Sequence, residues 1–127
     1  MNRKNISSGS HLEEPIGFSR AVRIGNFISV SGTAPIAEDG TTLYSNDLYS
    51  QTKVCIEIMK KAIEEAGGKM ENVIRTRIYL KDAKEWKKAA NAHGEFFSKI
   101  RPACTFVEVK GFIDPEWLVE TEADCVI

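Results

Sequence analysis

The last ten residues read Leu118-Val119-Glu120-Thr121-Glu122-Ala123-Asp124-Cys125-Val126-Ile127, residues 118–127. Apolar or small side chains alternate here with acidic ones, and this period of two predicts a β-strand with one buried face. Glu120, Glu122 and Asp124 are two residues apart, so their side chains share the other face. Three like charges on one face repel each other unless neighbouring strands compensate them.

The preceding segments supply the partners of this strand. A hairpin around Gly25-Asn26 is predicted from the β-type runs at residues 21–24 and 27–31. The spacing of apolar residues predicts a helix over 47–66, capped by Asn46 or Ser45 and ended by two glycines. A second helix follows Asp82, which forms a capping box with Glu85, and it ends before Pro102.

Two more strands complete the pattern, at residues 73–80 and 103–110. In the first of these, four residues are expected on the buried face: Ile74, Thr76, Ile78 and Leu80. The order ββ-α-β-α-ββ predicts an α+β domain with a five- to six-stranded sheet and two helices on one face. Residues 17–127 form this single domain, and residues 1–16 are expected to be a polar N-terminal arm.

The second face of the sheet lacks a predicted cover. Several apolar or aromatic residues are expected there, and they favour self-association through the sheet: Val22, Val30, Val73 and Tyr79.

Composition excludes several classes of protein. The 127 residues are 43% hydrophobic and 28% charged, as in an ordinary globular domain, and the net charge of −1 offers no basic field for nucleic acid. No apolar run approaches the roughly 20 residues that span a bilayer, so no membrane association is expected. Residues 1–14 lack the apolar core of a secretory signal, which predicts a cytoplasmic location. Three widely spaced cysteines, without CxxC or a suitable histidine pair, predict neither disulfides nor a zinc site.

The acidic row formed by Glu120, Glu122 and Asp124 has two interpretations. It is either a polar sheet face paired across strands to Arg75, Arg77 or Lys110, or it holds one carboxylate that sits in a cleft with a raised pKa and moves protons. The sequence favours the paired face and does not say which carboxylate a cleft would hold.

Three other places in the chain carry candidate chemistry. Cys104 is either a nucleophile, activated by Arg101 or His93, or a small packing residue, and packing is favoured. His93 lies on the apolar stripe of the second helix, where a hydrogen-bonded core role is favoured over catalysis. Ser31-Gly32-Thr33 offers hydroxyls and a permissive backbone that suit a carboxylate or oxyanion, but it equally suits a strand end.

Several segments, in this order and spacing, resemble the Rid family, also called the YjgF or L-PSP endoribonuclease family. The resemblance runs from about Gly17 to the end of the sequence. It is carried by the following residues: Gly17-Phe18-Ser19-Arg20-Ala21-Val22, Val30-Ser31-Gly32-Thr33-Ala34-Pro35, Gln51, Glu65-Ala66-Gly67-Gly68, Arg75-Thr76-Arg77-Ile78-Tyr79-Leu80-Lys81-Asp82, Glu95-Phe96-Phe97, Arg101-Pro102-Ala103 and Leu118-Val119-Glu120-Thr121-Glu122-Ala123.

The resemblance implies a chorismate-mutase-like fold and a homotrimer with a central barrel and ligand clefts between subunits. It also implies hydrolysis of enamine and imine intermediates of amino-acid metabolism to 2-oxo acids and ammonia, without metal or organic cofactor. The residues that match the family's cleft are Phe18, Ser31 and Gly32, and Glu120 matches the glutamate that holds the attacking water.

Two positions depart from the family's deaminase pattern. Cys104 stands where the pattern has an arginine that grips the substrate carboxylate, and Ala90 stands where it has an asparagine. Asn91 is one residue out of register, which turns its side chain by about 100° around the helix. His93 takes a place usually held by tyrosine. Arg20, where the family often has glutamine, and Arg101 are candidates to replace the missing arginine.

These observations predict a trimeric Rid-type protein whose cleft binds a small carbonyl- or imine-type metabolite. Hydrolysis of enamines or imines by a water held on Glu120 is one expected activity. A non-catalytic binding or regulatory module on the same fold is the alternative. An endoribonuclease is disfavoured, because the near-neutral charge and the lack of a basic and aromatic stripe suit RNA poorly.

Overall fold

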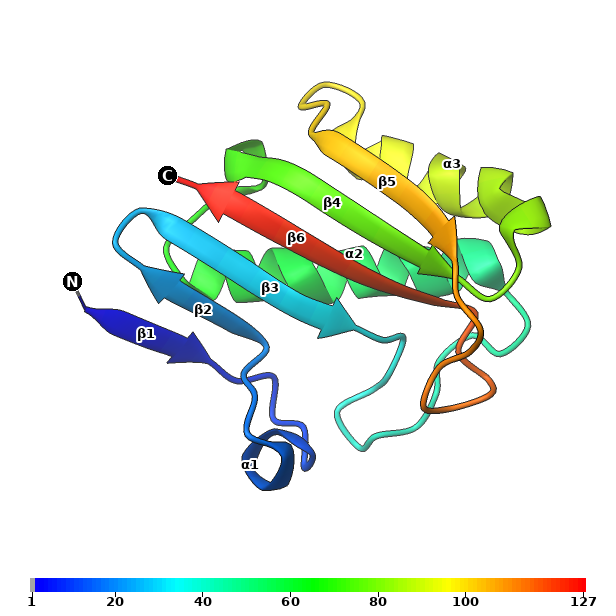
Figure 1. Cartoon of the computed structure of the whole chain (residues 1–127), viewed down its shortest axis with the longest axis horizontal. Helices are drawn as coiled ribbons and strands as arrows, with labels where there is room; N and C mark the ends of the chain where they lie inside the picture. Colours follow the sequence, from blue (N-terminus) through cyan, green and yellow to red (C-terminus); the bar gives the residue numbers. More distant parts are fainter. Residues whose placement is uncertain (1) are drawn as a thin grey trace.

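Strand β6 (Val119–Val126) lies inside the sheet and is antiparallel to both of its neighbours, β3 (Phe27–Thr33) and β4 (Val73–Leu80). The computed structural model, which describes residues 2–127, arranges six strands in the order β1-β2-β3-β6-β4-β5 (Figure 1). The outer strands are β1 (Arg3–Ile6), β2 (Ala21–Ile24) and β5 (Ala103–Glu108), and β5 runs parallel to β4. The sequence therefore predicted the strands of the sheet well but not β1.

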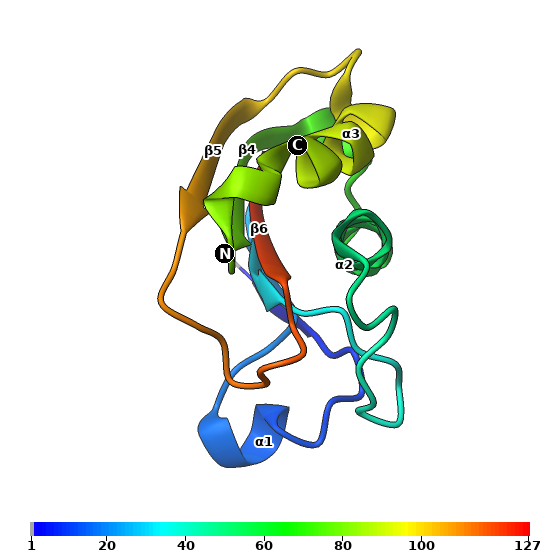
Figure 2. The same cartoon turned by 90° about the vertical axis from the view of Figure 1, so that its right-hand side faces the viewer.

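Two helices cover one face of this sheet. Figure 2 shows α2 (Leu48–Glu65) and α3 (Trp86–Phe97) on the same side, with the other side bare. The short helix α1 (Glu13–Ile16) lies at one end of the molecule, and 3-10 turns at Met70–Asn72 and Ala83–Glu85 precede β4 and α3. The predicted α+β class with two helices on one face is confirmed.

The core lies between the sheet and α2. Ile56, Met59 and Ile63 of α2 have no exposed surface and pack over β3 and β6, where Ile28 and Ala123 are equally buried. Burying a side chain of this size stabilises the fold by roughly 1.5–3 kcal/mol. A second cluster around Ile78 and Val119 extends the core toward α3.

The N-terminal segment, predicted as a polar arm over residues 1–16, contributes to the sheet. Residues 3–6 pair with β2, where Arg3 lies opposite Ile24 and Ile6 lies opposite Ala21. Ile6 is buried, and the Nζ of Lys4 donates to the carbonyl of Glu65 at the end of α2. The alternation in these four residues is too short and polar to reveal a strand, because an edge strand needs only one buried side chain.

A bulge in β4 changes which side chains face the helices. The register with β6 shifts between Val73 and Arg75, so Val73 is buried and Ile74 is half exposed, against the prediction. Val30, predicted on the bare face, is also buried against α2. Of the residues expected to favour self-association, only Val22 and Tyr79 lie on the bare face.

The helix starts differ slightly from the expected ones. Asp47, rather than Asn46 or Ser45, caps α2, and its side chain accepts a hydrogen bond from the Ser50 amide. Asp82 caps the 3-10 turn at Ala83–Glu85 instead of α3 itself, because the chain makes this tight turn before α3 begins.

Gln51 of α2 joins two distant loops. It is fully buried, its Nε2 donates to the carbonyls of Leu43 and Glu116, and its Oε1 accepts from the amide of Leu118. These three bonds hold the loop before α2 and the loop before β6 against the helix. A buried amide that satisfies three backbone groups fixes their positions more strictly than apolar packing would.

We expect Gln51→Leu to lower the free energy of unfolding by about 2–4 kcal/mol, since three buried backbone groups lose their partners. Urea unfolding at 25 °C measures this change. Glu57→Ala, an exposed substitution on the same helix, is the control and is expected to change stability by no more than about 0.5 kcal/mol. Equal stability of the two variants would contradict the role of Gln51.

Candidate functional site

Two members of the acidic row on β6 are paired across strands. The carboxylate of Asp124 lies 3.1 Å from Arg77 Nη1 and accepts a hydrogen bond from Ser29 Oγ at 3.0 Å. The Tyr79 hydroxyl donates to Glu122 at 2.6 Å. For these two residues the geometry supports the interpretation as a compensated polar sheet face. Neither Arg75 nor Lys110, the other two suggested partners, forms an ion pair with the row among residues 2–127.

Glu120 has a different environment from the rest of the row. Burial raises the pKa of Glu120, the positive charge of Arg20 lowers it, and the negative charge of Glu122 raises it further. None of the causes of this pKa shift is a hydrogen bond. A β-carbon on Gly32 would lie 2.8 Å from Glu120 Oε2, so a glycine there leaves room for the carboxylate. Glu120 is therefore the one member of the row with the properties of a proton-transfer group.

A cavity of about 270 Å³ brings four of the predicted site residues together. Phe18, Arg20, Gly32 and Glu120 all line it. Their convergence follows from the sheet register, which sets the end of β3 beside the start of β6. A concave and largely apolar space with a few polar groups is the usual form of a small-molecule site.

Arg20 is held firmly at this cavity. Only 6% of its surface is exposed, and its Nη1 donates to the carbonyl of Gly32 at 2.6 Å and to Thr33 Oγ1 at 3.1 Å. Burial lowers the pKa of its guanidinium, while Glu13 and Glu120 raise it. Because an arginine stays protonated at any ordinary pH, the cavity carries a fixed positive charge close to a carboxylate.

The hydroxyl of Ser31 is hydrogen-bonded to the backbone and does not line the cavity. Its hydroxyl lies 2.9 Å from the carbonyl of Ser19 and 3.1 Å from that of Arg20, and it donates across the join between β3 and the segment before β2. This contact fixes the position of Arg20, and Ser31 is not among the residues that line the 270 Å³ cavity.

Cys104 and His93 lie in a separate place, at β5 and α3. His93 Nε2 is 2.8 Å from Thr76 Oγ1 and 3.8 Å from Cys104 Sγ. Burial lowers the pKa of His93, so its ring is neutral at pH 7 and supplies no positive charge to stabilise a thiolate. The geometry thus gives little support to Cys104 as a nucleophile.

The sheet register separates these two groups of predicted residues. Cys104 is in the row of Thr76 and Ala123, which face the helices, whereas Glu120 is in the row of Tyr79, which does not. Arg101, the second candidate to replace the missing arginine, is exposed at a positive φ of 58° before β5 and does not line the cavity.

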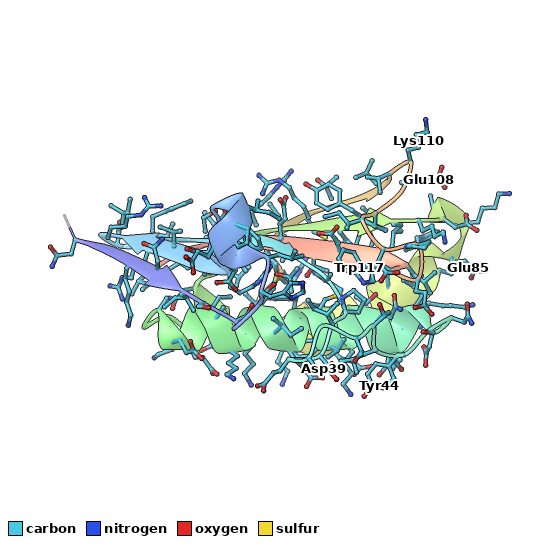
Figure 3. All side chains as sticks on the ribbon, turned by 90° about the horizontal axis from the view of Figure 1, so that it is seen from below. Asp39, Tyr44, Glu85, Glu108, Lys110 and Trp117 are labelled. Carbon is cyan, nitrogen blue, oxygen red and sulfur yellow. The ribbon has the colours of Figure 1, made fainter. Side chains whose placement is uncertain are left out.

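Most of the cavity wall was not predicted from the sequence. Ile36, Ile58, Ile113 and Trp117 come from two loops and from α2, and the hydrogen bonds of Gln51 help to bring them together. Trp117 Nε1 donates to Thr42 Oγ1, which ties the two loops directly. Figure 3 shows Trp117 between the sheet and α2, with Asp39 and Tyr44 on the helix side of the molecule.

Within residues 2–127, no three His, Cys, Asp or Glu side chains group in a way that would hold a metal ion. No helix in the same range is long and apolar enough to cross a membrane.

Comparison with known proteins places this fold and sequence in one family. Residues 10–127 match the family described as endoribonuclease L-PSP. The chain belongs to this family, the Rid or YjgF family. The crystal structure of a Mycobacterium tuberculosis member of the YjgF/YER057c/UK114 family superposes with a TM-score of 0.90 at 38% identity, covering 99% of this chain and 100% of that one. The predicted Rid fold is thereby confirmed.

Two curated relatives in the Rid family extend the comparison. An uncharacterised protein of Streptomyces coelicolor is 41% identical over 122 residues, which is 95% of this chain and 90% of that protein. The 3-aminoacrylate deaminase RutC of Acinetobacter baylyi is 30% identical over 100 residues, or 79% of each chain. A deaminase is therefore among the relatives whose similarity extends over most of this chain.

The three cysteines of this Rid protein differ sharply in exposure. Cys104 is exposed, whereas Cys55 and Cys125 have no exposed surface, and burial raises the pKa of the Cys125 thiol to about 11. We expect a thiol reagent at pH 8 to label one thiol per native chain and three after unfolding. Cys104→Ser should abolish native labelling, and modification of Cys55 or Cys125 in the folded protein would contradict the structure.

Proposed function

We propose that this protein is an enamine or imine hydrolase, a deaminase of the Rid type in which Glu120 holds the attacking water. The single observation that carries the proposal is the position of Glu120: a carboxylate with a burial-raised pKa and no hydrogen-bond partner among residues 2–127, at the wall of a small-molecule cavity. The similarity to a 3-aminoacrylate deaminase supports the same class of reaction.

The reaction needs a proton acceptor that later acts as a donor. Water adds to the carbon of the C=N bond while Glu120 takes the water proton. That proton passes to the nitrogen, which completes the carbinolamine. Glu120 then takes the proton of the carbinolamine hydroxyl and passes it to the nitrogen; the C–N bond breaks, the nitrogen leaves as ammonia, and the carbon keeps the oxygen as a carbonyl. A carboxyl group whose pKa is raised toward the working pH is suited to both halves of this cycle.

The proposal includes a homotrimer with ligand clefts between subunits. Two features support it. The first is the bare sheet face, which carries the half-buried residues Val22 and Tyr79 and has no helix within residues 2–127 packed on it. The second is that Cys104 and His93 lie on the opposite side of the sheet from Glu120 within one chain. In an assembly with shared clefts, the Cys104 group of one subunit would border the Glu120 cavity of another.

A non-catalytic binding module on the same scaffold is the competing function. It shares the cavity and predicts saturable binding, seen as a ligand-dependent rise in melting temperature, without turnover.

We expect ammonia release from enzymatically generated 2-imino acids, and we expect Glu120→Gln to lower the rate at least about 100-fold, since an amide cannot accept the water proton. The matched control is Glu122→Gln, an acidic residue on the same strand that is hydrogen-bonded to Tyr79 and does not line the cavity. Its rate should stay within about threefold of the wild type.

The absence of any rate above buffer for all imino acids tested would remove the hydrolase proposal. If the corresponding 2-oxo acids raise the melting temperature of the protein while no ammonia is released, the non-catalytic binding module is favoured instead. Equal losses in the two variants would show that the acidic row matters as a whole and not through Glu120.

A further inference from the structure

Two oppositely charged side chains of the cavity wall lie near each other without forming an ion pair. Arg20 and Glu120 both line the cavity, and each influences the pKa of the other, yet the ion pairs formed within residues 2–127 include neither of them. The other acidic group near Arg20, Glu13, is already hydrogen-bonded to the amide and hydroxyl of Ser8. Arg20 and Glu120 therefore remain available to a ligand that carries both an anionic and a nitrogen-bearing end.

The guanidinium of Arg20 presents one unused edge. Its two hydrogen bonds, to Gly32 and Thr33, both start from Nη1 and use neither Nε nor Nη2. Nε is buried and has no hydrogen-bond partner among residues 2–127. Nε and Nη2 donate in parallel from one edge of the guanidinium, and this fork matches the two oxygens of a carboxylate. A buried donor without a partner is destabilising, so a ligand oxygen at this edge would satisfy it.

The rest of the cavity lining combines a group of apolar residues with exposed polar ones, Ser8, His11, Glu38, Lys61 and Glu65. Ile16, Phe18, Ile58, Ile113 and Trp117 belong to the apolar group, and Arg20 lies over the Phe18 ring with its guanidinium carbon 5.5 Å from the centroid. Ile113 is 80% exposed and Ile16 is 62% exposed, so both offer apolar surface to a ligand in the cavity. A volume of about 270 Å³ leaves room for a side chain beyond the three-carbon skeleton of an aminoacrylate.

We propose that Arg20 is the carboxylate-binding residue of this site, and that the substrate is an enamine or imine acid with an apolar side chain. The carboxylate pairs with the Nε and Nη2 edge of Arg20, the C=N carbon faces Glu120, and the side chain packs on the isoleucines and Trp117. The identity of the reacting group rests on the proposed function, but the recognition of a carboxylate with an apolar tail does not. Arg20 thus takes the role that the resemblance assigns to an arginine at position 104.

Calorimetric titration with three stable probes tests this recognition without turnover. The probes are 4-methyl-2-oxopentanoate, which has both carboxylate and tail, 4-methyl-2-pentanone, which lacks the carboxylate, and pyruvate, which lacks the tail. We expect the first to bind the wild-type protein roughly 30-fold or more tightly than the ketone, as expected for a bidentate charged pair in a cavity. Pyruvate should bind at least about 10-fold more weakly than the first probe, because it buries no tail.

Variants of Arg20 assign the preference to this residue. In Arg20→Met the preference for the acid over the ketone should disappear while the ketone still binds, and Arg20→Lys should keep only part of it. The matched control is Arg23→Gln: Arg23 is on the adjacent strand, donates to the carbonyl of Ala66 and does not line the cavity. It should retain the full preference.

Equal binding of acid and ketone by the wild type would overturn the proposal, whether or not the Arg20 variants fold. An undiminished preference in folded Arg20→Met would overturn it as well. Acid-selective binding without ammonia release would reject the hydrolase and leave carboxylate recognition by Arg20 standing. Turnover without selectivity for the carboxylate would support the hydrolase and overturn that recognition.

Discussion

The fold depends on the strict alternation of β6 in the middle of the sheet. Val119, Thr121, Ala123 and Cys125 have no exposed surface because α2 and its neighbouring layer cover them, so the residues between them must lie on the other face. A slip of one residue would place three carboxylates in the core. The register with β3 and β4 is therefore fixed by the cost of burying charge, and the same register sets Glu120 beside Gly32.

This register gives acidic residues of the same strand two different environments. Asp124 and Glu122 face Arg77 and Tyr79 on β4 and are satisfied there. Glu120 lies where β3 bulges away, next to a glycine, and finds no donor. A half-buried carboxylate without a hydrogen-bond donor works against stability, and Glu120 stands at the end of the row where a cavity and Arg20 adjoin it. A carboxyl group with a shifted pKa beside a cavity is a candidate functional group.

The sequence predicted those helices and strands in which apolar residues recur at a regular spacing. A regular spacing of apolar residues predicted three of these parts: the strands around Gly25-Asn26, the helix over 47–66 and the strand over 118–127. Strand β1 and the bulge at Val73 show no such spacing, since one depends on an edge pairing distant in sequence and the other on a single inserted residue. The family resemblance identified Glu120 and Gly32. The rest of the cavity wall comes largely from loops held together by Gln51 and by the Trp117–Thr42 hydrogen bond, and no local sequence pattern predicts these contacts.

Glu120 is a half-buried carboxyl group whose pKa is raised by burial and lowered by Arg20. Carbon-13 NMR titration of the glutamate side-chain carboxyl groups measures this directly, with Glu122→Gln and Glu120→Gln used for assignment. The structure predicts that Glu120 titrates above the ordinary glutamate pKa, and that it moves higher still in Arg20→Met because the opposing positive charge is gone. A Glu120 that titrates like an exposed glutamate, and that does not respond to the loss of Arg20, would contradict it.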